Sequence, residues 1–358
     1  MALSDATHSS AYTARAAHLP VDREVILSLW LDAHAALTPT TMAAKLQRQY
    51  VDNPAGTGLL LLLEHGRDAD PVGVQGLMPR RFALGERAFR AGTLADYAVT
   101  ARHRSLWPAL SLLRATSEAG HASMDFLYSF TNRKSEAVFR RSGMPSPTGL
   151  RRYVRPLRSE HRVAGLMHGA WHRMRGPATA VIDALLAIDN LGRFARTGRR
   201  WRWTDQQDFG PVFDDIWNGS RRAGWLVGER SAEMLRWRYP KGNGYRISVA
   251  TDRRNGRPEG YAVWRCQSEC IDILDFFCRE ADAQLAGLLS SFAWQYGGAD
   301  IQSIALEFAG PQALSMAMAR AGFRDRGSNP VFLATRQADI SALPVDSIYL
   351  TSFDRDSG

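Results

Sequence analysis

The chain contains few cysteines. It has three in 358 residues, Cys266, Cys270 and Cys278, and an odd number without paired spacing argues against a disulfide framework. There is no Cys-x-x-Cys pair, and the sequence HGAWH, with His168 and His172 one helical turn apart, lacks the glutamate of the HExxH zinc motif. We therefore expect no bound metal, and a reducing, cytoplasmic environment fits this composition.

Long hydrophobic runs are also missing. Residues 1–20 lack the basic start and the apolar core of a signal peptide. The most apolar stretches, at 59–63 and 180–188, are too short or too interrupted to cross a bilayer. We expect a soluble protein without a transmembrane segment.

Acidic residues are in the minority. Asp and Glu number 36 against 45 Lys and Arg, which gives a formal net charge of +9. The excess is mostly arginine, the side chain best suited to planar recognition of phosphates and carboxylates. An anionic partner is favoured, and a cofactor phosphate, a nucleic acid and an anionic membrane surface all remain open.

Glycine is absent from one turn where it would be informative. Residues 94–110, LADYAVTARHRSLWPAL, are typical of a strand, a turn and the start of a helix. The backbone N–H groups of such a helix start can hold a phosphate, but phosphate-binding turns usually contain glycine, whereas this one reads Arg-Ser-Leu-Trp-Pro. The residues leave open a cofactor site, a remodelled turn and a plain connection.

The two halves of the chain repeat one order of elements. Each half predicts two helices, three strands, a helix, a strand, a second helix and a closing strand. Asp96-Tyr97 corresponds to Asp275-Phe276, and RRSGM at 140–144 corresponds to ARAGF at 319–323, both at an offset of 179 residues. Two matches at one offset favour a duplicated α/β unit.

The repeat suggests four segments. We expect a first unit at 20–157, a basic helical connector at 158–205, a second unit at 206–340 and an acidic C-terminal tail at 341–358. A length of 358 residues is comfortable for two domains.

The order of motifs resembles the GNAT acyltransferase superfamily. Val99 at a strand end, Arg104 in the turn that follows, and Asn132, Phe139 and Gly143 in the later helix stand where that family has its motifs. The resemblance implies a tandem GNAT protein: two layered α/β units, each with a mixed, mainly antiparallel sheet flanked by helices. The stretch Leu235–Tyr239 is similar to tandem GNAT proteins associated with bacterial exopolysaccharide production, a looser analogy.

The resemblance also implies a donor, acetyl-CoA or another acyl-CoA, and the residues that would bind it. Trp107 stands where the family has glycine, so its indole must point away from the phosphates or stack on the adenine. The candidate donor-binding residues lie on the strand, on the turn with its helix, and on the later helix: Tyr97, Ala98, Val99, Arg102, Arg104, Ser105, Trp107, Ala109, Asn132, Ser135 and Phe139.

For catalysis, an amine must lose a proton and a thiolate must leave. Asp96 is the candidate base and Tyr128 the candidate acid, whereas Phe139 has no proton to give. Asp96 recurs as Asp275, which is equally consistent with a role in the fold. Catalysis by positioning and ordered water is the alternative.

The second unit has lost the features of a donor site. Position 104 becomes Ala283, position 132 becomes Pro311, and Glu280 and Asp282 occupy the turn. Carboxylates would repel a pyrophosphate. We expect this unit to cover the site, bind the acceptor or mediate assembly.

The residues and the resemblance together leave three alternative functions. The first is an acyl-CoA-dependent, acetyl-CoA-type N-acyltransferase that acts directly on a primary amine of a small molecule or polysaccharide precursor. The second is a tandem GNAT transferase that uses aminoacyl-tRNA, and the third is an inactive pair that serves as a binding subunit. The basic connector adds membrane-surface contact as an expected partner interaction, and the oligomeric state is left open.

Overall fold

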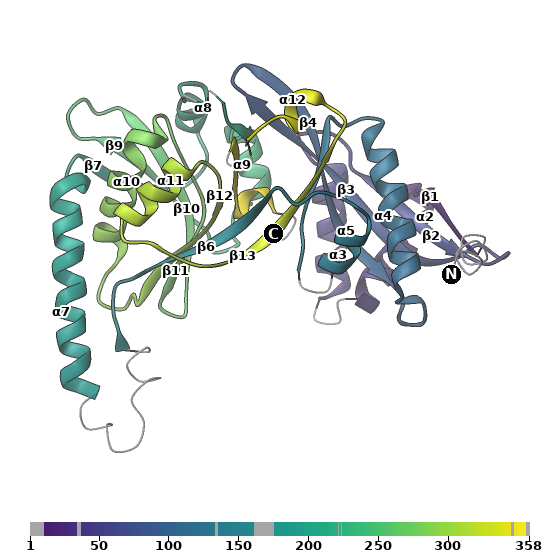
Figure 1. Cartoon of the computed structure of the whole chain (residues 1–358), viewed down its shortest axis with the longest axis horizontal. Helices are drawn as coiled ribbons and strands as arrows, with labels where there is room; N and C mark the ends of the chain where they lie inside the picture. Colours follow the sequence, from purple (N-terminus) through teal and green to yellow (C-terminus); the bar gives the residue numbers. More distant parts are fainter. Residues whose placement is uncertain are drawn as a thin grey trace. The chain divides into compact units, whose positions relative to one another are not determined.

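The computed structural model describes residues 11–33, 37–132, 135–160, 175–220, 222, 224–344 and 347–355. The chain divides into two compact units (Figure 1). Unit 1 comprises the residues up to Gly149, Asn329–Val345 and the residues from Arg355, and unit 2 comprises Leu150–Ser328 and Asp346–Asp354.

Unit 1 contains a mixed sheet between helices. Its strands run in the order β1-β2-β3-β4-β5-β13, and all neighbours are antiparallel except the parallel pair β4–β5. Its elements are β1 (Tyr12–Ala16), α2 (Leu19–Ala33), α3 (Pro39–Leu46), the π-helical η1 (Gln47–Val51), β2 (Leu59–His65), β3 (Asp70–Leu84), β4 (Arg87–Val99), the 3₁₀ turn η2 (Ala101–His103), α4 (Leu106–His121), β5 (Phe126–Phe130), α5 (Glu136–Arg141), β13 (Arg324–Thr335) and α12 (Ala338–Ser341).

Helices cover both faces of the unit 1 sheet. Leu60 and Leu62 pack with Ile26 and Trp30 of α2, whereas Leu63 packs on the other face with α4. Successive side chains of a strand point to opposite faces. The run LLLLL at 59–63 is therefore the sequence of a strand buried on both sides.

Unit 2 repeats this plan. Its strands run in the order β6-β12-β11-β10-β9-β7, again with one parallel pair, β11–β12. Its elements are β6 (Thr148–Pro156), α7 (Arg175–Arg193), the π-helical η4 (Phe194–Gly198), β7 (Trp201–Gln206), α8 (Pro211–Asn218), β8 (Leu226–Gly228), α9 (Ala232–Arg238), β9 (Arg246–Asp252), β10 (Pro258–Gln267), β11 (Cys270–Cys278), α10 (Ala281–Tyr296), β12 (Ser303–Ala309), α11 (Gln312–Arg320), β14 (Ile348–Thr351) and the 3₁₀ turn η6 (Ser352–Asp354). Two tandem α/β units with mixed, mainly antiparallel sheets confirm the predicted fold class.

The closing strand of each repeat lies in the other unit. β6 ends the first repeat in sequence, yet it pairs with β12 of unit 2. The C-terminal half of β13 ends the second repeat and pairs with β5 of unit 1. Two copies of one unit offer equivalent edges, so either closing strand can complete either sheet. The expected segment 20–157 groups β6 with the first unit, whereas the structure places β6 from Leu150 onward in unit 2.

The segments expected as connector and tail contribute to unit 2. Within 158–205 lie α7, η4 and most of β7, and His168 and His172 fall outside the described residues. Trp201 and Trp203 alternate with exposed Arg202 and are buried in β7. Within 341–358 lie β14 and η6, whose side chains are mostly buried.

Within the described residues, no helix combines the length and apolar character that a membrane span needs.

An ion pair between a partly exposed arginine and a buried carboxylate fixes the start of unit 1. Arg15 of β1 donates two hydrogen bonds to Asp22 of α2, at 2.7 and 2.9 Å, and one to Glu64 of β2 at 2.6 Å. The backbone N–H of His18 also donates to Asp22, at 2.7 Å. These hydrogen bonds, chiefly those from Arg15, hold the pKa of the Asp22 carboxyl at about 2.

We predict that Asp22→Asn lowers the free energy of unfolding at pH 7 by about 1–3 kcal/mol, because hydrogen bonds to a charged group are lost. A depressed carboxyl pKa stabilises the fold above the ordinary value near 4, and this contribution disappears as the pH falls towards 2. The difference from the unsubstituted chain should therefore shrink between pH 4 and pH 2 in thermal unfolding followed by circular dichroism. Glu24→Gln, on an exposed residue of the same helix, is the control, and a difference that persists at pH 2 would contradict the assignment.

Candidate active site

Strands β4 and β5 part in the middle of the unit 1 sheet. They pair in parallel from Ala91 with Phe126 to Thr93 with Tyr128, and beyond this point the Ser129 hydroxyl donates to the Leu94 carbonyl at 3.0 Å. No further ladder pair of β4 with β5 follows in the described register. The separation leaves an opening at the carboxyl end of β4.

A bulge accompanies this opening. Opposite β3, Gly76 pairs with Ala95 and Val74 with Ala98, so the intervening residues of β4 leave the regular register. Asp96 in this bulge has a φ of 52°, a left-handed conformation that is uncommon outside glycine but is tolerated best by Asp and Asn. Strained residues of this kind cluster at functional sites.

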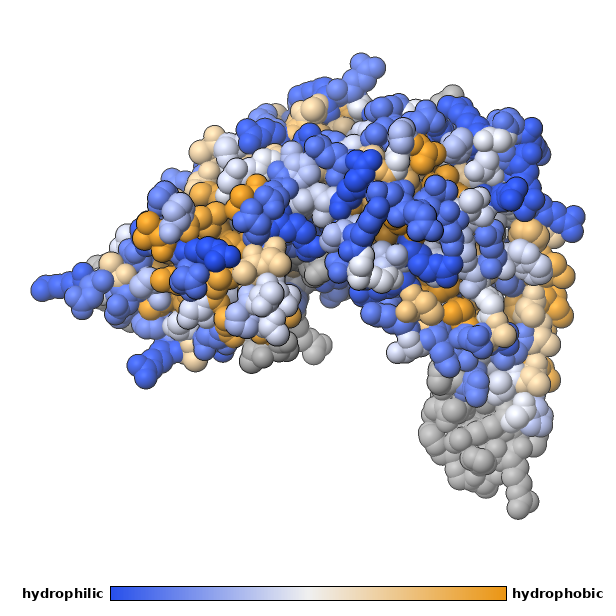
Figure 2. Space-filling model, turned by 180° about the vertical axis from the view of Figure 1, so that it is seen from behind, coloured by the Kyte–Doolittle hydropathy of each residue, from blue (hydrophilic) through white to orange (hydrophobic). Residues whose placement is uncertain are grey.

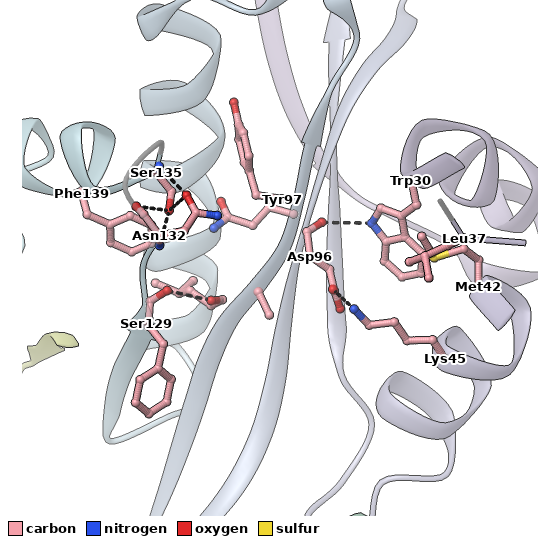
Figure 3. Close-up of a pocket in the computed structure, with 14 residues that line it drawn as sticks. Trp30, Leu37, Met42, Lys45, Asp96, Tyr97, Ser129, Asn132, Ser135 and Phe139 are labelled. Carbon is pink, nitrogen blue, oxygen red and sulfur yellow. Dashed lines mark hydrogen bonds and ion pairs between the residues drawn. The ribbon is translucent and has the colours of Figure 1, made fainter. Parts of the chain in front are cut away.

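Two cavities adjoin the bulge. Both are lined by Gln75, Tyr97, Asn132, Ser135 and Phe139. The larger, of about 430 Å³, is also lined by Ala33, Ala98, Val99, Arg104, Ala109, Leu113 and Val138. The smaller, of about 280 Å³, is also lined by Trp30, Leu37, Met42, Lys45, Leu94, Ala95, Asp96, Ser129 and Phe130 (Figure 3).

Asp96 is held from three sides. Its carboxylate forms an ion pair with Lys45 Nζ and accepts a hydrogen bond from Tyr50 Oη at 2.7 Å, while Trp30 Nε1 donates to its backbone carbonyl at 3.0 Å. Figure 3 shows Lys45 and Trp30 reaching Asp96 from the helices opposite β4. An ionised carboxylate offers about four lone-pair sites, so two donors leave it able to accept a further proton or hydrogen bond.

Gly76 makes room for the Tyr50 contact. A Cβ at this position would overlap the Tyr50 hydroxyl. The absence of a side chain on β3 therefore lets Tyr50 cross the strand and reach Asp96.

At the other end of the opening, Arg104 lines the larger cavity. Its Nε donates to the Val99 carbonyl at 2.9 Å and its Nη2 donates to Asp32 at 3.4 Å. α4 begins at Leu106, after an extended Ser105 that makes no side-chain cap. The first N–H groups of a helix lack intrahelical partners, so this end offers backbone donors and the positive end of a helix dipole beside a guanidinium.

Tyr97 lines both cavities. Partial burial, which leaves 36% of the residue exposed, raises the pKa of its phenol to about 12. The hydroxyl therefore stays protonated at neutral pH and can donate a hydrogen bond.

The structure brings most of the predicted donor residues to one wall. The larger cavity includes Tyr97, Ala98, Val99, Arg104, Ala109, Asn132, Ser135 and Phe139, and Asp96 lines the smaller one. Asn132 Oδ1 accepts from the Ser135 N–H at 3.0 Å, and Ser135, not Asn132, is the residue that precedes the first turn of α5.

Four predicted residues lie elsewhere. Arg102, Ser105 and Trp107 line neither cavity, and among the described residues the buried Trp107 Nε1 has no hydrogen-bond partner. The indole of Trp107 therefore offers no stacking face to either cavity. Tyr128 is 1% exposed.

The Tyr128 ring packs among Phe82, Phe126 and Phe130. It lines neither cavity, and its assignment as the acid is corrected on this ground. Its neighbour Ser129 lines the smaller cavity and donates to the Leu94 carbonyl at the opening.

Sequence reasoning missed Lys45, Tyr50, Gln75 and Ser129. Lys45 and Tyr50 lie 51 and 46 residues before Asp96. No spacing rule links positions so far apart. The one available signal is the pair of small residues at Gly73 and Gly76 in β3, which is typical of close approach by other groups.

The corresponding opening in unit 2 is filled. β11 and β12 pair in parallel from Cys270 with Ser303 to Ile273 with Leu306, and beyond this point β14 pairs with Phe308 and Ala309 of β12. Tyr349 of β14 donates to the Phe276 carbonyl of β11 at 2.5 Å. The C-terminal segment thus occupies the place that remains a cavity in unit 1.

Asp275, the counterpart of Asp96, holds this segment. It accepts hydrogen bonds from Tyr261 and Thr351 at 2.7 Å each and is fully buried, and burial raises the pKa of its carboxyl. Buried Arg230 lies 3.6 Å from Asp275 and binds Asp354 at 2.6 Å. In unit 2 this carboxylate serves the fold.

The stretch Leu235–Tyr239 takes part in the same arrangement. Arg238 donates to the carbonyls of Phe353 and Ser352, at 2.9 and 3.1 Å. The stretch Leu235–Tyr239 is thus a helix end that anchors the C-terminal turn.

Among the described residues, no group of three or more His, Cys, Asp or Glu side chains is placed to hold a metal ion.

Comparisons with known proteins support the fold. No protein-family model matches the chain, and no curated protein matches it in sequence. Among solved structures, it is similar to a protein from Enterococcus faecalis described as a "Probable N-Acyltransferase" (TM-score 0.64, 11% identity, covering 90% of this chain and 72% of the other). It is also similar to GCN5-related N-acetyltransferases from Anabaena variabilis (0.60, 10%, 90% and 72%) and Kribbella flavida (0.56, 12%, 91% and 72%).

The chain therefore has the fold of the GNAT N-acetyltransferase structures. At these identities the likeness is one of fold. The chemistry has to be argued from the residues of unit 1.

We predict that Asp354→Ala lowers the free energy of unfolding by about 3–5 kcal/mol, because it leaves the buried Arg230 without its closest carboxylate. Denaturant unfolding of the full chain measures the change. Asp339→Ala is the control, because this residue forms an exposed pair with Arg87 and such pairs contribute little. Equal losses in the two variants would contradict a structural role for the filled opening.

Proposed function

We propose that the protein is an acyl-CoA-dependent N-acyltransferase whose active site lies in unit 1. The acyl group, from acetyl-CoA or another acyl-CoA, would be transferred directly to a primary amine of a small molecule or polysaccharide precursor. The observation that carries the proposal is the opening between β4 and β5, with Asp96 at one cavity and Arg104 at the adjoining one.

The larger cavity suits the donor. The start of α4 and Arg104 together favour a pyrophosphate, and Arg104 is held in place by the Val99 carbonyl. Several of the other lining side chains, such as Leu113 and Val138, are apolar and suit the arm of a thioester. When bound, acyl-CoA would supply an activated carbonyl carbon.

The smaller cavity suits an amine. An ammonium group must first lose one proton to water before its nitrogen can attack. The Asp96 carboxylate, although paired with Lys45, can then take the second proton, which the neutral amine loses as its nitrogen bonds to the carbonyl carbon. The carbon–sulfur bond then breaks. Lys45 and Tyr50 fix the carboxylate in position.

The phenol of Tyr97 would donate a hydrogen bond instead of a proton. With a pKa of about 12, it is a weaker acid than an ordinary thiol of pKa near 8.5. Full transfer of its proton to the leaving thiolate would be uphill. The thiolate can leave without a strong acid, and Tyr97 would help to stabilise developing negative charge.

We expect Arg104→Glu to weaken CoA binding at least tenfold, because it replaces the guanidinium at the larger cavity by a carboxylate. Isothermal titration calorimetry with CoA measures the affinity. Arg102→Glu makes the same charge change on an exposed residue that lines neither cavity, and it should have the smaller effect.

Three outcomes of this titration decide between the functions. Binding by the unsubstituted chain that Arg104→Glu abolishes supports the proposal. Absence of CoA binding together with salt-sensitive binding of aminoacyl-tRNA would support the tRNA-dependent transferase. Binding of neither would leave the inactive binding pair.

Asp96→Asn should reduce kcat by about 10²–10⁴ if Asp96 is the base, with little effect on CoA affinity. The release of free thiol from acetyl-CoA in the presence of a panel of small primary amines and amino sugars measures turnover. Asp52→Asn, on a residue at the end of η1 outside both cavities, is the matched control. A kcat unchanged by Asp96→Asn would show that positioning and water suffice.

A further inference from the structure

Helix α7 carries an apolar stripe on its outer side. Five large apolar side chains follow one another at helical spacing, and Figure 2 shows hydrophobic surface along this helix. The side chains and their exposed fractions are Val181 (62%), Ile182 (40%), Leu185 (62%), Ile188 (66%) and Leu191 (49%).

The polar side chains of α7 contact unit 2 instead. Asp183 accepts from the Ser159 N–H at 2.7 Å, and Asn190 accepts from Arg155 Nη2 at 2.5 Å. Arg193 donates to the Arg320 carbonyl. A surface helix ordinarily turns its apolar stripe to the core and its polar face to water. α7 has the opposite orientation, so its stripe needs a partner outside the unit.

Cationic and aromatic side chains follow the stripe. Arg196, Arg199 and Arg202 are exposed, and no carboxylate among the described residues forms an ion pair with them. Phe194, directly after α7, stacks on Trp294 with ring centroids 4.8 Å apart. Trp294 is 45% exposed.

The acidic residues of α7 do not oppose an anionic partner. Asp183 faces unit 2, as above. Asp189 forms an ion pair with Arg193 at 2.7 Å, which neutralises its charge locally.

We propose that α7 binds the surface of a bilayer containing anionic lipids, with its stripe lying among the acyl chains next to the headgroups. An amphipathic helix with large apolar side chains, a neighbouring tryptophan and arginines has the composition of interfacial helices. The arginines would contact lipid phosphates. The proposal does not depend on acyl transfer.

A second copy of the chain is the weaker candidate occupant. The stripe spans eleven residues, from Val181 to Leu191, or about 15 Å of helix. A stable protein interface uses roughly 20–30 residues from each side. Five side chains on one helix are too few for a stable dimer, whereas they suffice for reversible attachment to a membrane assisted by charge.

Co-sedimentation of the full chain with vesicles tests the proposal. Vesicles of phosphatidylcholine alone and vesicles with a third of phosphatidylglycerol serve as probes. We expect binding to the anionic vesicles, at least tenfold weaker binding to the neutral ones, and weakening by 0.5 M salt. The double substitution Leu185→Glu/Ile188→Glu should reduce binding at least tenfold.

Further variants separate the contributions of the stripe, of charge and of folding to lipid binding. Met316→Glu changes an equally exposed apolar residue of α11 in the same unit and should leave binding unchanged. Arg199→Glu/Arg202→Glu should reduce binding to anionic vesicles and diminish its salt dependence. The circular dichroism spectrum and the midpoint of thermal unfolding should be the same in all these variants if both units stay folded.

Two results would overturn the proposal. One is a chain that stays in the supernatant with both kinds of vesicle. The other is a doubled mass in light scattering that Leu185→Glu/Ile188→Glu restores to the monomer value, which would assign the stripe to a second copy.

Discussion

The site depends on the backbone of Asp96. This residue has a left-handed conformation in the middle of a strand, which costs on the order of 1–3 kcal/mol unless the surroundings determine it. Here they do: Lys45 and Tyr50 bind its carboxylate, and Trp30 binds its carbonyl. The same bulge displaces β4 from its ladder and creates the cavities. The strain and the opening are thus two consequences of one local geometry.

Duplication shows what this geometry becomes when its surroundings change. β11 and β12 part as β4 and β5 do, but β14 fills the space. Asp275, at the position of Asp96, is satisfied by Tyr261 and Thr351 and is buried. In unit 1 the carboxylate faces a cavity, and in unit 2 it binds a segment of the chain. Carboxylates such as Glu280 and Asp282, in the turn of unit 2, would repel an anionic donor.

Local patterns in the sequence predicted much of this. Apolar runs, cap residues and the internal repeat predicted two α/β units, each with a mixed sheet. The motif residues Tyr97, Val99, Arg104 and Asn132 do line one cavity. Features that depend on distant pairing could not be predicted. The sequence of each closing strand suits either sheet, so the exchange of these strands cannot be predicted from local pattern. The contact of Tyr50 with Asp96 depends on Gly76, which lies between them in the structure and not in the sequence. Tyr128 and Ser129 are adjacent residues of β5. A shift of the strand register by one residue would exchange the surroundings of the two side chains.

The most direct test of this account is the stoichiometry of CoA binding, measured by isothermal titration calorimetry on the full chain. One open unit and one filled unit predict a single molecule of CoA per chain. Two molecules per chain would contradict the assignment of unit 2 as filled, and none would contradict the assignment of unit 1 as the donor site.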